Sequence, residues 1–190
     1  MTAQPDFKGE LVAAAPHLRA FARGLCGRAD MADDLVQETL LRAWSARERF
    51  TAGTSMRAWT FTILRNIWLT EMRRNRFRGD YDQTQAERLL VTPAAQEGPL
   101  HLADLSRALM AMPSERREAL LLVGAGGFSY EEAAEICGCA LGTIKSRVAR
   151  GRAQLAAMIE DGKIGSRTGS ADASATLLAE LDRISPEKPA

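Results

Sequence analysis

Five side chains that can bind DNA lie close together in the C-terminal half of the chain: Thr143, Lys145, Ser146, Arg147 and Arg150. Lysine and arginine neutralise phosphates, and serine or threonine can approach base edges in the major groove. Between Leu141 and Arg152 the chain has four cations and no acid. This pattern predicts a basic helix that contacts duplex DNA, although a solvated face on an ordinary helical hairpin would also explain it.

The residues around this basic segment predict a helix-turn-helix. Ser129 can cap a first helix together with Glu132, and Gly138 allows a turn after it. A second helix is expected to begin near Leu141. Its inward side should carry Leu141, Ile144, Val148 and Leu155. Two short helices joined by a tight turn are a common arrangement for reading DNA.

Catalytic and metal-binding patterns have little support. The chain has no phosphate-binding glycine loop and no H-E-x-x-H motif, and His17 and His101 are isolated. Cys137 and Cys139 could form a metal or redox site, but two buried small residues at a helical turn explain the pair better. We therefore expect no catalytic residues, no cofactor and no metal site.

The composition is that of a soluble globular protein, with 46% hydrophobic and 26% charged residues among 190. No apolar run approaches the ~18 residues of a membrane span. The start of the chain, MTAQPDFKGE, lacks the basic residues and apolar core of a signal peptide. Three cysteines provide no disulfide framework. These features predict a cytoplasmic protein.

Charge is segregated along the chain, although the net charge is only +1. The segment from Asp30 to Glu38 has four acids and no base, whereas the segment from Arg57 to Arg78 has six arginines and one acid. Such a separation predicts different surfaces for different partners.

Apolar periodicity predicts an N-terminal group of three helices. The first spans Phe7 to Leu25, with Pro16 ending one helix or beginning another. The second runs from an Asp30 cap to about Arg47. Its expected buried stripe is Val36, Leu40, Ala43 and Trp44. After a loop from Ser45 to Ser55, a third helix from Met56 to about Arg76 is apolar around much of its girth, which favours the middle of a bundle.

The rest of the chain predicts a second helical group. Residues 78–100 have no apolar periodicity and are interpreted as a flexible linker. Helices are then expected from Leu102 to Met112 and from Pro113 to the glycines near Gly124, before the helix-turn-helix. Residues 159–190 are interpreted as a flexible tail. The predicted fold is all-α, with two small helical domains, 7–77 and 101–158, joined by the linker.

Three segments resemble the extracytoplasmic-function sigma factors, in the family's order. They are DMADDLVQETLLRAW, SMRAWTFTILRNIWLTEMRRNR and MPSERREALLLVGAGGFSYEEAAEICGCALGTIKSRVARGRAQL. Within the family, LLLVGAGGFSYEEAAEICGCALGTIKSRV and ADDLVQETLLRAW are most similar to the EcfG type, the sigma factors of the alphaproteobacterial general stress response. The resemblance implies a non-enzymatic protein that binds core RNA polymerase and directs promoter-specific initiation.

The resemblance also implies a role for each surface. Polymerase binding would fall to Asp34, Gln37, Glu38 and Leu41. The minus-10 promoter element would be bound by Arg65, Asn66, Arg73, Arg74 and Arg76. The minus-35 element would be bound by Thr143, Lys145, Ser146, Arg147 and Arg150. An unstacked promoter base would enter a pocket made by the loop from Ser45 to Ser55 and the start of the next helix.

Two aromatic residues in that helix, Trp59 and Phe61, are assigned to the bundle core and not to base stacking. Two positions depart from the family. Gly151 lies inside the basic helix and should loosen its far end, and Ser55 stands where many relatives have asparagine.

Regulation by a small anti-sigma protein is also implied by the resemblance. Two alternatives remain open at this point. One is a sigma-mimicking regulator that binds an anti-sigma factor without binding a promoter. The other is an ordinary helix-turn-helix regulator, which would leave the acidic helix and the arginine-rich helix unexplained.

Overall fold

The computed structural model describes residues 6–78 and 99–160, and every regular element in these ranges is helical. In chain order these elements are α1 (Phe7–Cys26), α2 (Ala29–Ser45), η1 (Arg47–Arg49), α3 (Met56–Arg78), α5 (Pro99–Met110), α6 (Ser114–Leu120), η2 (Leu121–Ala125), α7 (Tyr130–Cys137) and α8 (Leu141–Glu160). The predicted all-α class is confirmed. Most of the predicted linker and nearly all of the predicted tail lie outside the described residues.

Helix α1 is continuous, so the prediction that Pro16 breaks it was wrong. Asp6 caps its first turn by accepting a hydrogen bond from the Lys8 amide at 3.1 Å, and Gly27, with φ of 70°, ends it. Proline at position 16 removes one amide donor, whose helical partner would be the carbonyl of Val12. Both residues lie on the exposed side of α1, where water can hydrogen-bond that carbonyl.

Helix α2 differs from its prediction in its cap and in its buried stripe. The residue before the helix is Arg28, and Asp30 lies in the first turn, where its Oδ2 is 2.5 Å from Nη2 of Arg28. This contact holds the pKa of Asp30 below its usual range. The helix ends at Ser45, before Arg47. Val36 and Ala43 are buried as expected, but the Trp44 side chain is 46% exposed.

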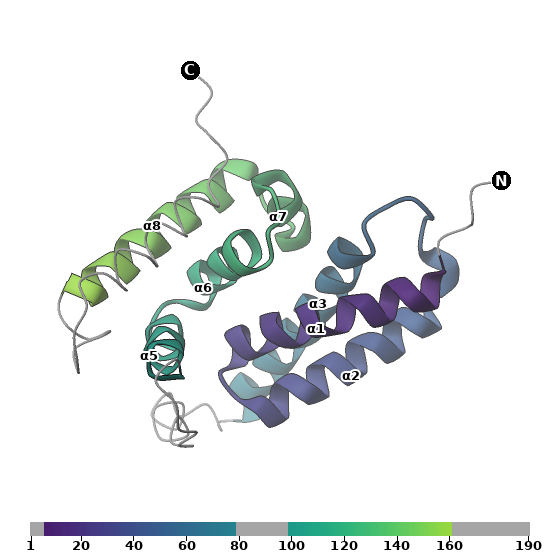
Figure 1. Ribbon diagram of the computed structural model, residues 1–190, viewed down its shortest axis with the longest axis horizontal. Helices are drawn as coiled ribbons and strands as arrows, with labels where there is room; N and C mark the ends of the chain where they lie inside the picture. Colours follow the sequence, from purple (N-terminus) through teal and green to yellow (C-terminus); the bar gives the residue numbers. More distant parts are fainter. Residues whose placement is uncertain (1–5, 79–98, 161–190) are drawn as a thin grey trace.

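Helix α3 lies against both α1 and α2, as its apolar girth predicts (Figure 1). Ser55 begins it by accepting a hydrogen bond from the Ala58 amide at 3.1 Å. Phe61 and Leu64 are fully buried, which confirms the core assignment of Phe61, and Trp59 is partly buried against the core. The serine that departs from the family pattern therefore serves as a helix cap.

The predicted helix-turn-helix is confirmed. The Ser129 hydroxyl accepts from the Glu132 amide while the Glu132 carboxylate accepts from the Ser129 amide, at 3.1 and 2.8 Å. Gly138, with φ of 59°, ends α7, and α8 begins at Leu141. Ile144, Val148 and Leu155 are buried. Leu141 was also expected to be buried, but it stands at the first position of α8 and is 36% exposed.

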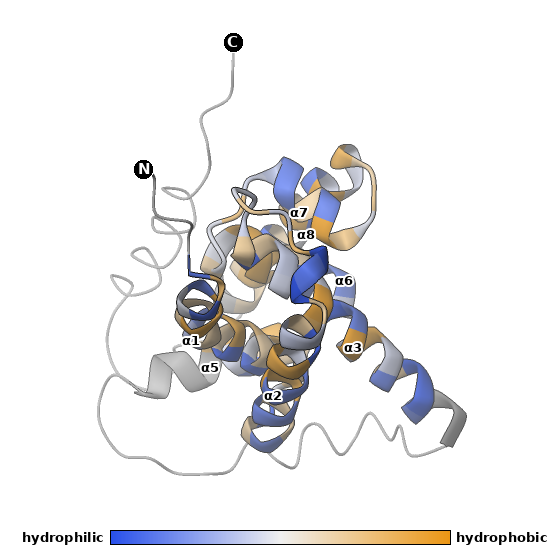
Figure 2. Cartoon of the chain, turned by 90° about the vertical axis from the view of Figure 1, so that its right-hand side faces the viewer, coloured by the Kyte–Doolittle hydropathy of each residue, from blue (hydrophilic) through white to orange (hydrophobic). Residues whose placement is uncertain are grey.

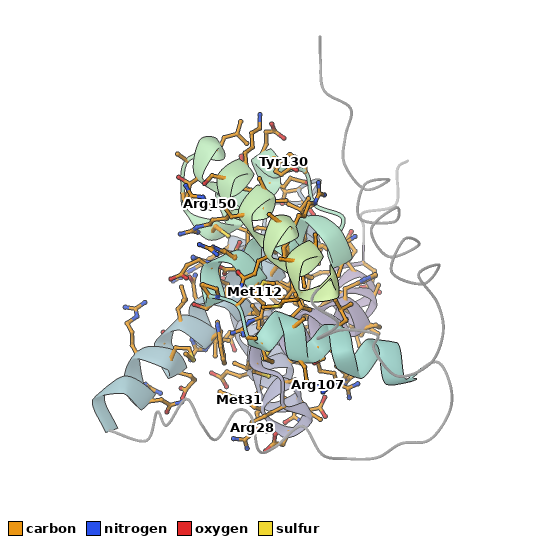
Figure 3. All side chains as sticks on the ribbon, turned by 90° about the vertical axis from the view of Figure 1, so that its left-hand side faces the viewer. Arg28, Met31, Arg107, Met112, Tyr130 and Arg150 are labelled. Atoms are coloured by element: carbon orange, nitrogen blue, oxygen red, sulfur yellow. The ribbon has the colours of Figure 1, made fainter. Side chains whose placement is uncertain are left out.

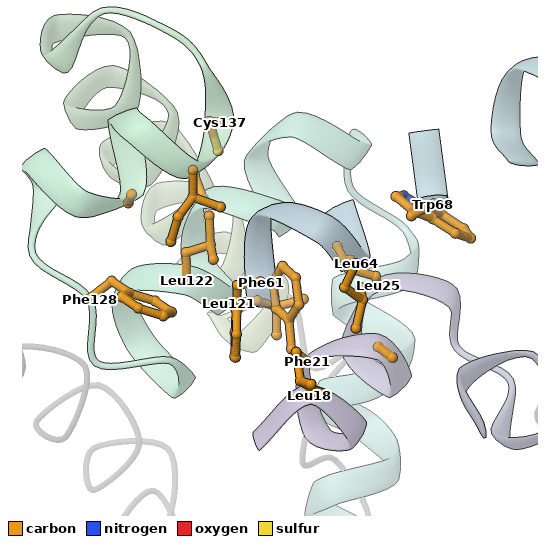
Figure 4. Close-up of a cluster of buried hydrophobic side chains, with 14 of the residues drawn as sticks. Leu18, Phe21, Leu25, Phe61, Leu64, Trp68, Leu121, Leu122, Phe128 and Cys137 are labelled. Carbon is orange, nitrogen blue, oxygen red and sulfur yellow. The ribbon is translucent and has the colours of Figure 1, made fainter. Parts of the chain in front are cut away.

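One hydrophobic core joins the N-terminal helices to the C-terminal ones (Figure 4). Phe61 of α3 stacks on Phe21 of α1 with ring centroids 4.7 Å apart, and meets Phe128 edge-on at 4.9 Å. Leu121 of η2 packs over Gly24 of α1, where a Cβ would lie 2.6 Å from a Leu121 methyl carbon. The two predicted domains are therefore in direct contact.

Among residues 6–78 and 99–160, no helix combines the length and apolarity needed to cross a membrane.

Gly151 does not interrupt α8, which continues to Glu160. This glycine is buried where α8 packs against α6, and a Cβ at position 151 would lie 2.7 Å from Cδ1 of Leu120 and 2.9 Å from its Cγ. Glycine is therefore required by the close approach of the two helices, in spite of its poor helix propensity.

Replacing Gly151 with alanine is expected to lower the free energy of unfolding by about 1–3 kcal/mol, because Leu120 must move. Gly142→Ala provides a matched control in the same helix, since a Cβ there has no neighbour within 4 Å. The control should be neutral or more stable by up to about 1 kcal/mol. Urea unfolding followed by circular dichroism measures both, and equal stability of the two variants would contradict the packing argument.

Candidate nucleic-acid interface

The structure brings the five predicted DNA-binding residues of α8 onto one helix. Lys145 and Arg150 are exposed, while Thr143, Ser146 and Arg147 are half-buried. The Ser146 hydroxyl donates to the Thr143 carbonyl at 3.0 Å. The buried Ile144 and Val148 hold the opposite side of α8 against the body of the protein. Hydrophobic anchoring on one side thus leaves a surface of cations and hydroxyls on the other.

This α8 surface lies far from the acidic start of α2. Figure 3 shows Arg150 of α8 and Tyr130 of α7 at one end of the molecule, and Arg28 and Met31 near the start of α2 at the other. On the inner side, Arg116 of α6 donates to the Gln154 side chain of α8 at 3.0 Å, which fixes the far half of α8. The cations of α8 and the acids at the start of α2 are therefore separated in space.

A second basic surface lies on α3. Asn66, Arg73 and Arg74 are exposed. Arg73 donates to the Leu69 carbonyl at 3.3 Å, and Arg74 pairs with Glu71 at 3.0 Å. This hydrophilic half of α3 extends beyond the other helices (Figure 2). Arg76 belongs to the same helix, but its side chain lies outside the described residues.

Arg65 does not join this surface in the observed conformation. Its Nε lies 2.6 Å from Oε1 of Glu118 on α6, and the two side chains are only 15% and 7% exposed. A buried pair in such close contact neutralises both charges, so the Arg65 guanidinium is committed to the C-terminal helices.

A neighbouring arginine, Arg57, also binds the C-terminal helices. It donates to the carbonyl of Gly126, and its guanidinium lies over the Phe128 ring at 4.9 Å from the centroid. Sequence reasoning missed the role of Glu118 and Arg57. The signal for Glu118 was its position three and four residues before the buried Leu121 and Leu122, which places a carboxylate on an apolar helix face.

The segment between α2 and α3 forms the expected loop. All residues from Thr51 to Ser55 are exposed. The Thr54 amide and hydroxyl both donate to the Thr51 carbonyl, at 3.1 and 2.7 Å, and Gly53 has φ of 89°. A short, internally bonded turn is therefore presented to solvent at the start of α3.

The predicted polymerase-binding residues share an exposed side of α2. Asp34, Gln37 and Leu41 are exposed, and Leu41 is so to 64%. Glu38 is half-buried and pairs with Arg42 at 2.6 Å. Leu41 also lines a shallow hollow together with Ser45 and Arg49. An exposed leucine bordered by polar side chains resembles the apolar core and polar rim of protein interfaces.

Cys137 is packed in the core. Burial, followed by the charge of Glu118, raises the pKa of its thiol to about 12, so the thiol stays protonated at neutral pH. Among the residues that the structure describes, no group of three or more histidine, cysteine or acidic side chains could hold a metal ion.

Comparison with known proteins gives matches for both groups of helices. Residues 11–78 match Sigma-70 region 2, and residues 102–155 match Sigma-70, region 4. The ECF RNA polymerase sigma factor EcfG of Rhodopseudomonas palustris (strain TIE-1) is 50% identical over 155 residues, which are 81% of this chain and 85% of that protein.

Two solved structures are also similar. The sigma factor RpoE in complex with the anti-sigma factor NepR from Bartonella quintana matches with a TM-score of 0.70 and 45% identity, over 82% of this chain and 97% of that one. CnrH, solved in complex with the cytosolic domain of CnrY, matches with a TM-score of 0.61 and 26% identity, over 82% of this chain and 88% of that one. The chain therefore belongs to the sigma-70 family, as an extracytoplasmic-function RNA polymerase sigma factor.

Proposed function

We propose that three separate surfaces of this sigma factor divide the work of promoter-specific initiation. The exposed side of α2 binds core RNA polymerase, the projecting part of α3 with the loop before it binds the minus-10 element, and α8 binds the minus-35 element. The observation that carries this proposal is that the acidic residues and the two sets of cations lie on three different helices, with the α8 cations at the opposite end of the molecule from the start of α2.

The α2 surface suits a protein partner with basic residues. Asp34 and Glu38, the latter paired with Arg42, carry the negative charge of this side of α2, and complementary charge speeds and orients protein association. The apolar Leu41 side chain, exposed to 64%, would be buried by the polymerase. Gln37 on the same side can exchange hydrogen bonds in either direction.

The minus-10 surface combines backbone contacts with base capture. Asn66, Arg73, Arg74 and Arg76 of α3 would hold phosphates of the melted strand, and the loop before α3 would receive an unstacked base. Arg65 can contribute only after its ion pair with Glu118 is broken, because that pair is buried.

The minus-35 surface is the exposed side of α8. Arg147 is half-buried in this surface, and arginine pairs with guanine through two hydrogen bonds. Lys145 and Arg150 are exposed and suit phosphates, while Thr143 and Ser146 can approach bases or phosphates.

The similarity to EcfG supports a role in the general stress response, and the similarity to RpoE bound to NepR supports control by an anti-sigma factor of the same kind. Such a partner would cover surfaces of both helical groups and keep the polymerase away. The site of action is the cytoplasm, where polymerase and promoters meet.

The polymerase contact is tested by Gln37→Ala combined with Glu38→Ala. The affinity for purified core polymerase should fall about tenfold, which corresponds to about 1.4 kcal/mol. Glu131→Ala is the control, because it also removes one carboxylate, from the exposed side of α7. Fluorescence anisotropy of labelled sigma factor measures the affinity of the parent protein, the double variant and the control for core polymerase. An affinity of the double variant equal to that of the control would reject the α2 assignment.

A further inference from the structure

Four aromatic side chains form a cluster beside the loop from Ser45 to Ser55. They are Phe7, Trp44, Phe50 and Trp59, called here the aromatic cluster. Phe7 contacts the other three, with ring centroids 6.1 Å from Trp44, 5.6 Å from Phe50 and 6.1 Å from Trp59. Phe50 and Trp59 also meet directly, at 5.2 Å. All four distances are in the range of favourable ring packing.

The rings of the cluster come from before, within and after the loop. Trp44 belongs to the last turn of α2, Phe50 follows η1, and Trp59 lies in the first turn of α3. The exposed turn from Thr51 to Ser55 is thus flanked by two rings that both pack on Phe7. The hydrogen bonds of Thr54 fix the turn internally, whereas the rings fix its place on the body of the protein.

Phe7 is held at a defined position by α1. It is the first residue of that helix, and Asp6 before it accepts a hydrogen bond from the Lys8 amide through its side chain and from the Glu10 amide through its carbonyl. Further along, α1 is anchored in the core by Leu11 and Leu18, which are buried. Phe7 also precedes the stretch that matches Sigma-70 region 2, which begins at residue 11.

The rings of the cluster do not offer a free platform for a base. Phe7, Phe50 and Trp59 pack on each other. Trp44 is exposed, but the Arg47 guanidinium lies over its ring, 5.6 Å from the centroid. Their common effect is on the position of the loop that they flank.

We propose that Phe7 is a positioning residue for promoter-base capture: it fixes the loop from Ser45 to Ser55 in the place where the loop receives an unstacked base of the minus-10 element. This inference rests on the base-capture role proposed above for that loop. Phe7 acts through Phe50 and Trp59, and contacts no DNA itself.

The test measures base discrimination at each promoter element by in vitro transcription with core polymerase. The readout is the ratio of initiation from a selected promoter to initiation from the same promoter with one base changed, in the minus-10 or in the minus-35 element. A variant that is merely less stable supplies fewer active molecules, which lowers both initiation rates and leaves each ratio unchanged.

Three variants are compared with the parent protein. Phe7→Ala should reduce minus-10 discrimination about tenfold while minus-35 discrimination is unchanged. Phe7→Tyr, which keeps the aromatic ring, should retain the minus-10 discrimination of the parent protein. Leu18→Ala is the control for stability, because it removes a fully buried side chain from the same helix about three turns away, and both of its ratios should match the parent protein.

Thr51→Gly combined with Thr54→Gly tests the loop itself, because it removes the Thr54 hydroxyl bond and loosens the turn. If this double variant loses minus-10 discrimination and Phe7→Ala keeps it, the positioning role of Phe7 is rejected and the loop assignment stands. If both keep it, the loop assignment fails, and the inference fails with it.

Discussion

A protein carrying Glu118→Ala is expected to unfold more readily and to separate its two groups of helices. The Arg65 side chain, which is only 15% exposed, would remain at its site without the carboxylate that now lies 2.6 Å away. Leaving one buried charge unpaired costs about 3–5 kcal/mol when the site stays dry. The pair joins α3 to α6, so separation of the helices would hydrate Arg65 and relieve part of this cost.

Three measurements test the expected effect of Glu118→Ala. Urea unfolding should show a loss of about 2–4 kcal/mol, and small-angle X-ray scattering should show a larger radius of gyration. The third is alkylation of Cys137 at pH 8 mapped by mass spectrometry, since burial and the Glu118 charge together raise the pKa of this thiol to about 12. Removing both influences should make Cys137 react faster.

The matched control replaces both partners, with Arg65→Met and Glu118→Met together. Two apolar side chains of similar length leave no buried charge, so this protein should be more stable than the Glu118→Ala protein and stay compact. Wild-type stability and dimensions in Glu118→Ala would show that the ion pair does not hold the helices together.

A second large effect is expected from Arg147→Ala on α8. Loss of a guanidinium that reads a base should reduce promoter-specific initiation by about 5-fold to 150-fold, the equivalent of 1–3 kcal/mol, and relax selectivity at one base pair of the minus-35 element. Selection of active promoters from a randomised library, sequenced for the parent protein and the variant, identifies that position.

Lys145→Ala distinguishes a phosphate contact from a base contact on the same helix. This exposed lysine should contribute equally to binding at all DNA sequences, so its loss weakens initiation without changing the selected motif. The slope of the logarithm of the DNA-binding constant against the logarithm of the salt concentration should become shallower by about one. Arg23→Ala, which removes an exposed cation from α1, should change neither. An unchanged motif with Arg147→Ala would contradict the base-reading role of Arg147.

Local sequence signals predicted the helix-turn-helix well, because its boundaries are set by neighbouring residues. The Ser129 and Glu132 capping pair and the left-handed Gly138 need no distant contact. The same local reasoning was wrong at Pro16 and Trp44. Proline was tolerated because its missing hydrogen bond faces water. Trp44 lies outside the core, in the last turn of α2, where its ring packs on Phe7.

The contacts between the two groups of helices could not be predicted in this way. Arg65 is separated from Glu118 by 53 residues in the chain, and the place of Glu118 on an apolar helix face does not tell which distant cation pairs with it. Gly151 shows the same limit, since its propensity predicts a weak point while its contact with Leu120 makes it necessary. In both cases the deciding contact is between residues that lie far apart in the chain.

We propose that the chain combines polymerase binding with promoter reading through separate surfaces. Transcription in vitro by purified core polymerase from a randomised promoter library tests it most directly, with the parent protein, Arg147→Ala and the Gln37→Ala, Glu38→Ala double variant. We expect one enriched two-part motif with the parent protein, a relaxed minus-35 part with Arg147→Ala, and the same motif at lower yield with the double variant. Absence of any enriched motif with folded parent protein bound to the polymerase would contradict it.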